Sequence, residues 1–225
     1  MIAQGLADVR QRIAAACDRC DRDPASVRLV AVSKKFDAQI VQQAVAAGQT
    51  LFGENRVQEA LDKIPQVGPG AQWHLIGHLQ RNKARHVVGR FDLIHGVEGI
   101  PLALELNRRT AAAGGRQPIL LQVNLSGEST KSGVEADALS ELIEAVIDLP
   151  ALELRGLMTI PPPVERPEES RVWFSRMRRL RDEAEQRQGL ALPELSMGMT
   201  GDFEVAVEEG ATLVRVGRAI FGERP

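Results

Sequence analysis

The residue best suited to covalent chemistry is a lysine that follows an apolar segment. Lys34 comes directly after residues 27–33 (VRLVAVS), and Lys35 is next. An ammonium group at the end of a buried strand is partly removed from water, which lowers its pKa and frees the amine to attack a carbonyl. Strand alternation places the two lysines on opposite faces without indicating which one points inward. Lys34 is the first candidate nucleophile and Lys35 the second, with two solvated lysines as the simplest alternative.

Two glycine-containing segments near the C-terminus are suited to binding an anion. Glycines let backbone N–H groups approach an anion closely, and the start of a helix favours negative charge. We expect Asp202 to cap the helix after the first segment. Ordinary turn formation is the alternative for both segments. Their small and polar residues are Ser196, Gly198, Thr200 and Gly201 in LSMGMTGDFE, and Gly217, Arg218 and Gly222 in RVGRAIFGE.

A reactive lysine combined with an anion site fits a phosphorylated aldehyde that is held as an imine. The lysine would condense with the aldehyde while the glycine-containing segments bind the phosphate. Pyridoxal 5'-phosphate (PLP) is one such aldehyde. A sugar phosphate bound by a Schiff-base aldolase needs the same two features, so these residues alone leave both ligand classes open.

Strand-like and helical segments alternate along the whole chain. Apolar residues recur every three or four positions over residues 2–16, which predicts an N-terminal helix. Eight strand-like segments follow, at 27–33, 51–53, 73–77, 92–97, 118–125, 152–160, 195–199 and 212–216. Helical segments come between them at 56–64, 80–88, 102–113, 136–149, 168–187 and 202–209.

Eight such units predict a single (β/α)8 TIM-type barrel over residues 1–225, with the N-terminal helix as an addition. An open, doubly wound sheet is the alternative. In a barrel the functional residues lie at the carboxyl ends of the strands, and a phosphate site is often built after strands seven and eight. Lys34 follows the first predicted strand, and the glycine-containing segments follow the last two. The fold therefore predicts that all three meet at one end.

The composition is that of an ordinary globular protein with no strong charge. The 225 residues carry 28 Lys and Arg against 30 Asp and Glu, for a net charge of −2. Such a chain has no general attraction to nucleic acid or to an anionic membrane. The apolar runs are too short for a membrane span, and charges interrupt the N-terminal segment where a signal peptide would be apolar. We therefore expect a cytoplasmic protein.

The smaller motifs are expected to be structural. Cys17 and Cys20 form a CxxC inside the predicted N-terminal helix, which favours reduced packing thiols over a metal or redox site. His74 and His78 are spaced HxxxH across a strand end, which is a poor arrangement for a metal. The many arginines of 168–187 have acidic neighbours, which favours a solvated helix face over a nucleic-acid surface.

Seven sequence blocks, in order along the chain, carry a family resemblance. They are AVSK at 31–34, FGENRVQE at 52–59, WHLIGHLQRNK at 73–83, VNLSGESTKSG at 123–133, LRGLMTIP at 154–161, LSMGMTGD at 195–202 and VRVGRAIFG at 214–222. Together they resemble the pyridoxal phosphate homeostasis proteins (YggS and PROSC type). Because the blocks span almost the whole chain, the resemblance is far more specific than any one of them.

The resemblance implies a barrel like the N-terminal domain of alanine racemase, with PLP bound covalently as an imine of Lys34. It implies a role in carrying and buffering PLP, with apo PLP enzymes as candidate recipients. Arg218 stands where the family usually has Thr or Ser, so its guanidinium would replace a hydroxyl contact to phosphate. The other implied contacts are Asn55 and Met158 near the ring, Arg215 at the pyridine nitrogen, and Ser196, Thr200, Gly201 and Gly217 at or near the phosphate.

The chemistry favours a PLP-binding protein without robust catalysis. An arginine keeps its own proton and repels a second positive charge, so Arg215 would leave the pyridine nitrogen unprotonated and the ring a poor electron sink. Two-base alanine racemases take one base from a tyrosine of a second domain, and this sequence has no tyrosine. A fold-type III amino-acid racemase or related PLP enzyme is the alternative. With few aromatic residues, a single barrel is expected to be a monomer.

Overall fold

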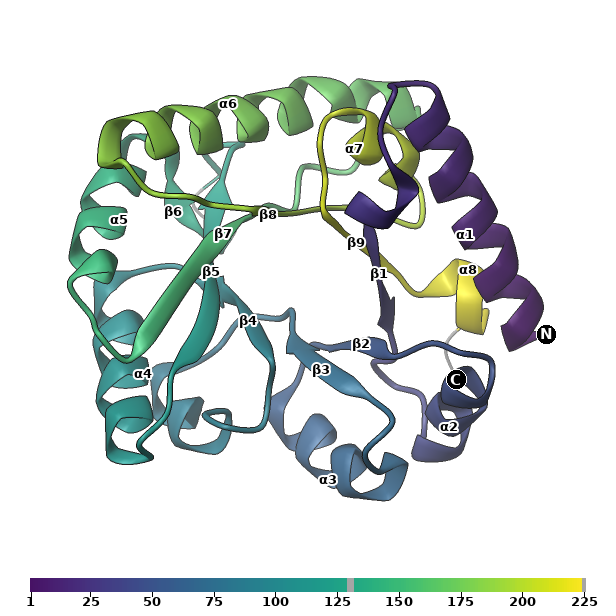
Figure 1. Cartoon of the computed structure of the whole chain (residues 1–225), viewed down its shortest axis with the longest axis horizontal. Coiled ribbons are helices and arrows are strands. Elements are labelled where there is room, and N and C mark those ends of the chain that lie inside the picture. Colours follow the sequence, from purple (N-terminus) through teal and green to yellow (C-terminus); the bar gives the residue numbers. More distant parts are fainter. Residues whose placement is uncertain (129–131, 224–225) are drawn as a thin grey trace.

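The computed structural model describes residues 1–128 and 132–223, and its centre is a closed parallel β-barrel. The strands pair in the order β4-β3-β2-β1-β9-β8-β7-β5, and a further β4–β5 pairing closes the ring (Figure 1). A short strand, β6 (Val134–Glu135), pairs with β5 outside the ring. The ring strands are β1 (Arg28–Val32), β2 (Leu51–Glu54), β3 (Gln72–Leu75), β4 (Leu93–Val97), β5 (Gln117–Asn124), β7 (Leu152–Met158), β8 (Glu194–Met199) and β9 (Leu213–Val216). The predicted barrel is confirmed.

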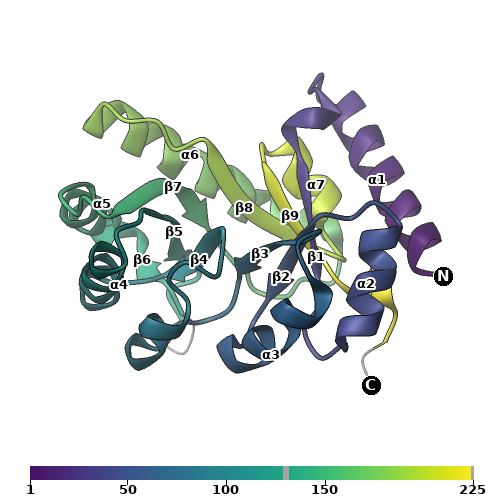
Figure 2. The same cartoon turned by 60° about the horizontal axis from the view of Figure 1, so that its bottom comes forward.

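Helices surround the ring on its outer side (Figures 1 and 2). The α-helices are α1 (Ile2–Asp18), α2 (Ala38–Ala46), α3 (Val57–Val67), α4 (Ile100–Ala112), α5 (Leu139–Ile147), α6 (Arg171–Gln188), α7 (Phe203–Glu208) and α8 (Arg218–Phe221). Among the described residues, four short 3-10 helices also occur: η1 (Pro24–Ser26), η2 (Arg81–His86), η3 (Ala136–Ala138) and η4 (Pro167–Ser170). The prediction of a full helix over 80–88 is wrong, because η2 occupies that stretch. The buried Ala84 and Val87 are three residues apart, which is the period of a 3-10 helix.

Two apolar cores explain why the strand segments are almost continuously hydrophobic. Along β1, Val30 belongs to the cluster inside the barrel, whereas Leu29 and Ala31 pack in the core that includes the surrounding helices. Strands covered on both faces need apolar residues at successive positions. The inner cluster consists of Val30, Val32, Leu51, Ile76, Leu93, Leu120, Met158 and Leu213.

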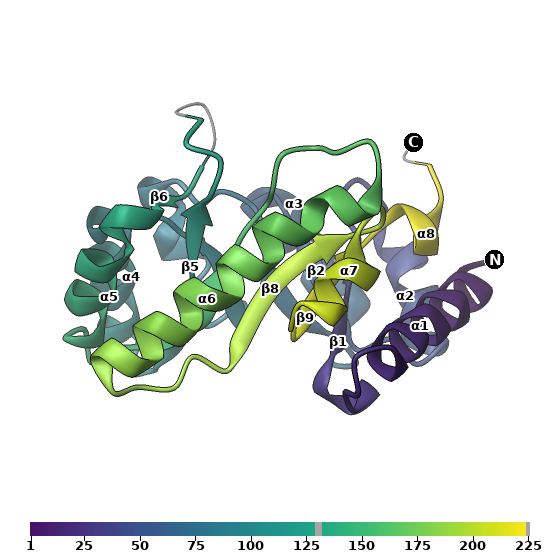
Figure 3. The same ribbon diagram turned by 90° about the horizontal axis from the view of Figure 1, so that it is seen from above.

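The N-terminal helix α1 packs against α7 and α8, the helices that follow the last two strands, β8 and β9 (Figure 3). Leu6, Val9 and Ile13 form its buried face. The approach to α8 is very close, because a Cβ at Gly5 would lie 2.7 Å from the backbone oxygen of Ala219. Within the described residues, no helix combines the length and apolarity needed to cross a membrane.

Candidate functional site

Parallel pairing brings the predicted lysine to the same end of the barrel as two other predicted residues. Val32, at the end of β1, pairs with Gly53 of β2. Two residues further along their strands, Lys34 and Asn55 therefore leave the sheet at the same level. On the other side, a Cβ at Gly217 would lie 3.2 Å from the carbonyl oxygen of Val32. The chain after β9 thus reaches the end of β1, as the fold prediction requires.

The alternation of β1 distinguishes the two candidate lysines. Val30 and Val32 face the barrel interior, and Lys34 continues this series one step beyond the strand. Lys34 is half-buried, whereas Lys35 is exposed. Lys35 also adopts a left-handed backbone conformation with φ of 69°, which turns the chain away from the strand direction. The geometry therefore favours Lys34 over Lys35 as the lysine nearest the interior.

A buried ion-pair network outside the barrel holds the backbone on both sides of Lys34. Lys63 of α3 donates to the carbonyl oxygen of Ser33 (2.9 Å), to Glu54 Oε1 (2.5 Å) and to Glu59 Oε1 (3.1 Å). The Ser33 hydroxyl also donates to Glu54 (2.6 Å), while the backbone N–H of Lys35 donates to Glu59 (2.5 Å). Burial raises the pKa of the Glu54 carboxyl, and the hydrogen bonds from Lys63 and Ser33 oppose that shift. We refer to Ser33, Glu54, Glu59 and Lys63 as the bracing network.

A buried arginine lies inside the barrel near its carboxyl end. Arg215 of β9 is 3% exposed. It donates through Nη1 to Ser196 Oγ (2.6 Å) and through Nη2 to the backbone oxygen of Thr159 (2.8 Å). Burial lowers the pKa of Arg215 to about 10, with the charge of Asp202 acting in the opposite direction, so the group stays protonated at neutral pH. Met158, which precedes Thr159, belongs to the inner apolar cluster.

Two buried histidines extend this arrangement across the barrel. His95 Nδ1 lies 2.9 Å from Ser196 Oγ, and His95 Nε2 lies 2.9 Å from His74 Nδ1. Burial lowers the pKa of His74 to about 3, aided by the charge of Arg28, and lowers that of His95 well below its usual value. The HxxxH pair is separated, because the exposed His78 contacts Glu98 instead. Sequence reasoning missed His95, whose signal is a single polar side chain within the otherwise apolar strand LIHGV at 93–97.

The segment after β8 turns sharply so that α7 can pack on the strand. Gly198 has a φ of 88°, and a Cβ there would lie 2.5 Å from that of Ala206. Asp202 occupies the N-cap position of α7, but its side chain makes no capping bond. It accepts instead from the Met199 N–H (2.7 Å) and the Ser170 hydroxyl (3.2 Å), so the capping prediction is wrong. The Asp202 carboxylate therefore accepts a hydrogen bond from within the turn that precedes α7.

Several predicted phosphate residues lie at the exposed rim of this end. Thr200 is half-buried and Gly201 is exposed. No heavy atom lies within 4 Å of the position a Cβ would take on Gly201. Gly217 is the N-cap of α8. The Arg218 side chain is 71% exposed, and its Nε lies 3.7 Å from a Glu223 carboxylate oxygen, so a contact between its guanidinium and phosphate stays a prediction.

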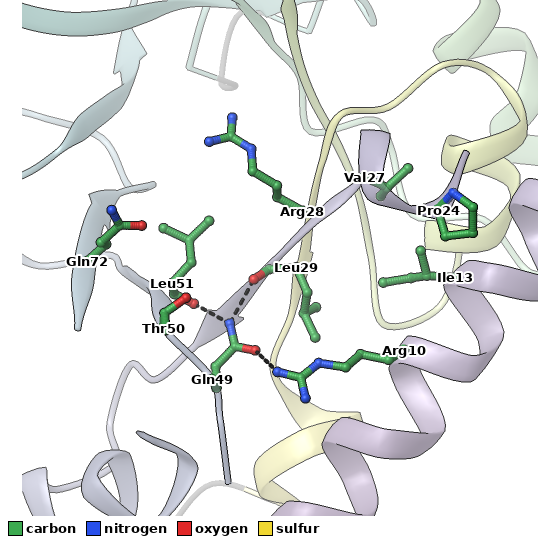
Figure 4. Close-up of a pocket in the computed structure, with 10 residues that line it drawn as sticks. All are labelled: Arg10, Ile13, Pro24, Val27, Arg28, Leu29, Gln49, Thr50, Leu51 and Gln72. Carbon is green, nitrogen blue, oxygen red and sulfur yellow. Dashed lines mark hydrogen bonds between the residues drawn. The ribbon is translucent and has the colours of Figure 1, made fainter. Parts of the chain in front are cut away.

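A cavity of about 390 Å³ opens at the opposite end of the barrel, where β1, β2 and β3 begin (Figure 4). Its lining includes Arg10, which donates to Gln49 Oε1 (3.1 Å). Arg28 also lines the cavity and forms a 2.5 Å ion pair with Glu194. Because functional residues of such barrels lie at the carboxyl ends of the strands, this cavity is not the predicted site.

The thiols of Cys17 and Cys20 are free, and the two residues lie in and just after α1. Cys17 is buried in α1, and the Cys20 thiol donates to the backbone oxygen of Ala16 (3.3 Å). Over residues 1–128 and 132–223, His, Cys, Asp and Glu side chains nowhere gather in groups of three or more that could hold a metal ion.

Comparison with known proteins identifies the family. The family model "Alanine racemase, N-terminal domain" matches residues 5–225. The pyridoxal phosphate homeostasis protein of Aquifex aeolicus is 44% identical over 220 residues, covering 97% of this chain and 96% of that protein. The chain belongs to the pyridoxal phosphate homeostasis protein family. The Escherichia coli K12 member is 42% identical over 232 residues, covering 99% of this chain and 97% of that protein.

Solved structures agree with this assignment. PipY of Synechococcus elongatus, solved both without and with PLP bound, has a TM-score of 0.88 and 40% identity, covering 99% of this chain and 100% of PipY. An alanine racemase of Clostridium difficile has a TM-score of 0.72 at 13% identity, covering 97% of this chain and 57% of that one. The second match shows a shared barrel fold. The family resemblance stated from the sequence is therefore confirmed.

Proposed function

We propose that this protein binds PLP as an imine of Lys34 and takes part in PLP homeostasis without robust catalysis. The observation that carries the proposal is the convergence of a half-buried lysine, a buried arginine and a glycine-containing rim at the carboxyl end of one barrel. Family membership and the PLP-bound structure of PipY support the same ligand.

The residues present suit the three chemical parts of PLP. The Lys34 amine would attack the aldehyde carbon, forming a C=N bond and releasing the aldehyde oxygen as water. Arg215 would face the pyridine nitrogen, with Asn55 and Met158 beside the ring. The remaining proposed contacts, at or near the phosphate, are Ser196, Thr200, Gly201, Gly217 and the backbone N–H of Arg218.

Arg215 supports a binding role over catalysis. Bound PLP supplies an electron sink whose strength depends on a protonated pyridine nitrogen. Arg215 stays protonated at neutral pH, since its lowered pKa is still about 10. A guanidinium that keeps its proton disfavours a second positive charge on a nearby ring nitrogen. The chain also contains no tyrosine, so a phenolic base would have to come from another chain.

Absorbance spectroscopy tests the lysine assignment. Protein mixed with PLP should show the visible band of an imine. Borohydride reduction should make the attachment permanent, and sequencing of the modified peptide should then locate the vitamer on Lys34. Lys34→Ala should lose the band, while its neighbour Lys35→Ala serves as the matched control and should keep it. A band that survives in Lys34→Ala but disappears in Lys35→Ala would reverse the assignment.

An amino-acid racemase is the second candidate, favoured by the barrel shared with alanine racemase. Racemisation followed by exchange of the α-hydrogen with solvent deuterium distinguishes the two functions. We expect rates no higher than those of free PLP with the same amino acids. Sustained turnover that Lys34→Ala abolishes would make the protein an enzyme. A Schiff-base aldolase would instead trap a sugar phosphate on PLP-free protein during borohydride treatment.

We further propose that apo PLP enzymes receive the vitamer. When PLP-loaded protein is mixed with an apo PLP enzyme, the enzyme should regain activity at a higher rate than the rate at which the same concentration of loaded protein releases PLP to an unrelated trap. Equal rates would mean that the vitamer passes through solution without contact between the two proteins.

A further inference from the structure

A row of four polar side chains crosses the buried interior of the barrel. It runs from Arg215 on β9 through Ser196 on β8 and His95 on β4 to His74 on β3, with successive distances of 2.6, 2.9 and 2.9 Å. Their exposures are 3%, 1%, 0% and 4% in that order. The proposed function uses Arg215 and Ser196 and leaves the two histidines without a role. Buried polar groups in such a row must satisfy one another.

Counting protons along the row leaves two arrangements. Burial keeps both imidazoles neutral, and a neutral imidazole has one N–H and one acceptor nitrogen. If His95 carries its proton on Nε2, it donates to His74 Nδ1, so His74 is protonated on Nε2 and the Ser196 hydroxyl donates to His95 Nδ1. If His95 carries its proton on Nδ1, it donates to Ser196, and His74 must donate from Nδ1 to His95 Nε2. The two rings therefore always share one tautomer.

The two arrangements differ in what Ser196 offers to a ligand. In both, Ser196 Oγ accepts a hydrogen bond from Arg215. In the first, its own proton is committed to His95, so the hydroxyl has nothing left to donate. In the second, Oγ accepts from both Arg215 and His95, and its proton is available to another acceptor. An anionic ligand next to Ser196 therefore favours the second arrangement.

We propose that His74 and His95 are positioning residues that switch tautomer together when the vitamer binds, releasing the Ser196 hydroxyl to donate to it. This inference rests on the proposed function. No covalent bond to carbon changes in the switch. The Ser196 proton passes to His95 Nδ1, the His95 Nε2 proton to His74 Nδ1, and the His74 Nε2 proton to water. Water on the ligand side returns a proton to Ser196, so the total number of protons on the row is constant.

Nitrogen-15 NMR of histidine-labelled protein reads the tautomers directly, because protonated and bare ring nitrogens have well-separated chemical shifts. The chain has four histidines, and a His78→Gln/His86→Gln variant leaves only the two buried ones to observe. Without PLP, both rings should carry the proton on Nε2. With PLP at saturation, both should carry it on Nδ1. The imine absorbance of the same sample reports binding independently.

The outcomes separate the two proposals. Rings of different tautomer, or rings unchanged while the imine band is present, would overturn the switch and leave the binding function intact. Absence of the imine band at any PLP concentration would remove the binding function and the switch with it. An imine band together with a joint change of both rings supports both.

Variants of Ser196 test whether the hydroxyl links ligand to histidines. Ser196→Thr keeps the hydroxyl and should keep the joint switch. Ser196→Ala, loaded until its imine band saturates, should show no change in either ring. A full switch in Ser196→Ala would show that the signal reaches the histidines by another route, and the role given to Ser196 would be wrong.

Discussion

His74 and His95 are neutral because the barrel interior removes them from water, and this has a consequence for stability. Burial lowers the pKa of His74 from 6.5 to about 3, and that of His95 shifts in the same direction. In the unfolded chain both rings bind protons below about pH 6.5, whereas in the folded protein they do not. Protonation therefore favours the unfolded state over this range.

We predict that the free energy of unfolding is highest above about pH 6.5 and falls on acidification, by about 1.4 kcal/mol per pH unit for each ring. Urea unfolding between about pH 7 and about pH 5 measures this slope. His74→Gln should make the slope shallower. His78→Gln is the matched control, since that side chain is 49% exposed. A slope that is the same in wild type and in His74→Gln would contradict the prediction.

Arg218 tests whether the proposed phosphate site uses a side chain or the backbone. Its side chain is 71% exposed, and its Nε lies 3.7 Å from Glu223 Oε1. An exposed side chain such as this one gains only about 0 to 1 kcal/mol from pairing with a charged group. We therefore expect Arg218→Ala to weaken PLP binding by less than about fivefold. A direct charged contact to phosphate would be worth roughly 1.5 to 3 kcal/mol. A loss of more than tenfold in an equilibrium titration would show that the side chain turns toward the ligand.

The sequence predicts the place of some residues in the candidate site and misses the contacts of others. Lys34 is recognisable because a charged residue ends an apolar run, and the inward direction of Val30 and Val32 then separates it from Lys35. The bond between His95 and Ser196 joins residues 101 positions apart in the chain. It exists only because the ring closes and brings β4 opposite β8. Local sequence patterns contain no information about such a pair.

At the scale of elements, the bracing network ties α3 to the turn that carries Lys34. Glu54 is fully buried and the Lys63 side chain is 5% exposed. Removing one partner of a buried ion pair leaves the other charge unpaired and costs about 3 to 5 kcal/mol. We predict that loss for Lys63→Met, measured by urea unfolding.

Two further variants separate the ion pair from simple packing. Lys63→Met combined with Glu54→Leu should recover most of the stability, because neither charge is then buried alone. Glu59→Gln should cost less than about 1 kcal/mol, since its side chain is partly exposed and keeps an acceptor for the Lys35 N–H. Equal losses in the single and the double variant would show that packing of Lys63, and not its charge, stabilises this region.

The contact between α1 and α8 gives a steric prediction. A Cβ at Gly5 would lie 2.7 Å from the backbone oxygen of Ala219, so the helices must move apart to accept it. Such overpacking costs about 1 to 3 kcal/mol. We expect that loss for Gly5→Ala in thermal unfolding. Gly115→Ala is the control, because no atom lies within 4 Å of its Cβ position; its stability should stay within about 0.5 kcal/mol.

Elements with strong periodicity were predictable, and those fixed by their neighbours were not. The apolar spacing of residues 2–16 indicated α1 because one face must be buried. Residues 80–88 carry too few apolar positions to separate an α-helix from the 3-10 helix that forms. Asp202 has the residue type of a cap, but the turn after Gly198 brings Met199 and Ser170 within its reach. Such competition between partners is decided by tertiary structure.

For the whole molecule, the distribution of exposed apolar side chains predicts a monomer. Among the described residues, the large exposed ones are Met1, Leu104, Ile147, Ile160, Val172 and Met199. Most lie on different elements, and scattered apolar residues do not form an interface. Sedimentation should give a single species near 24.6 kDa, with or without PLP. A particle of about twice that mass at micromolar concentration would contradict this.

The alternation of strands and helices predicted the barrel, and the pairing of its first strand with its last has a consequence for protein synthesis. β1 is paired on one side with β2 and on the other with β9, which includes residue 216. A growing chain therefore carries Lys34, the lysine proposed to bind PLP, just after a strand that has one open edge until β9 leaves the ribosome. If Lys34 binds PLP as proposed, newly made protein can hold the aldehyde in a closed barrel only after β9 has been synthesised and has paired with β1.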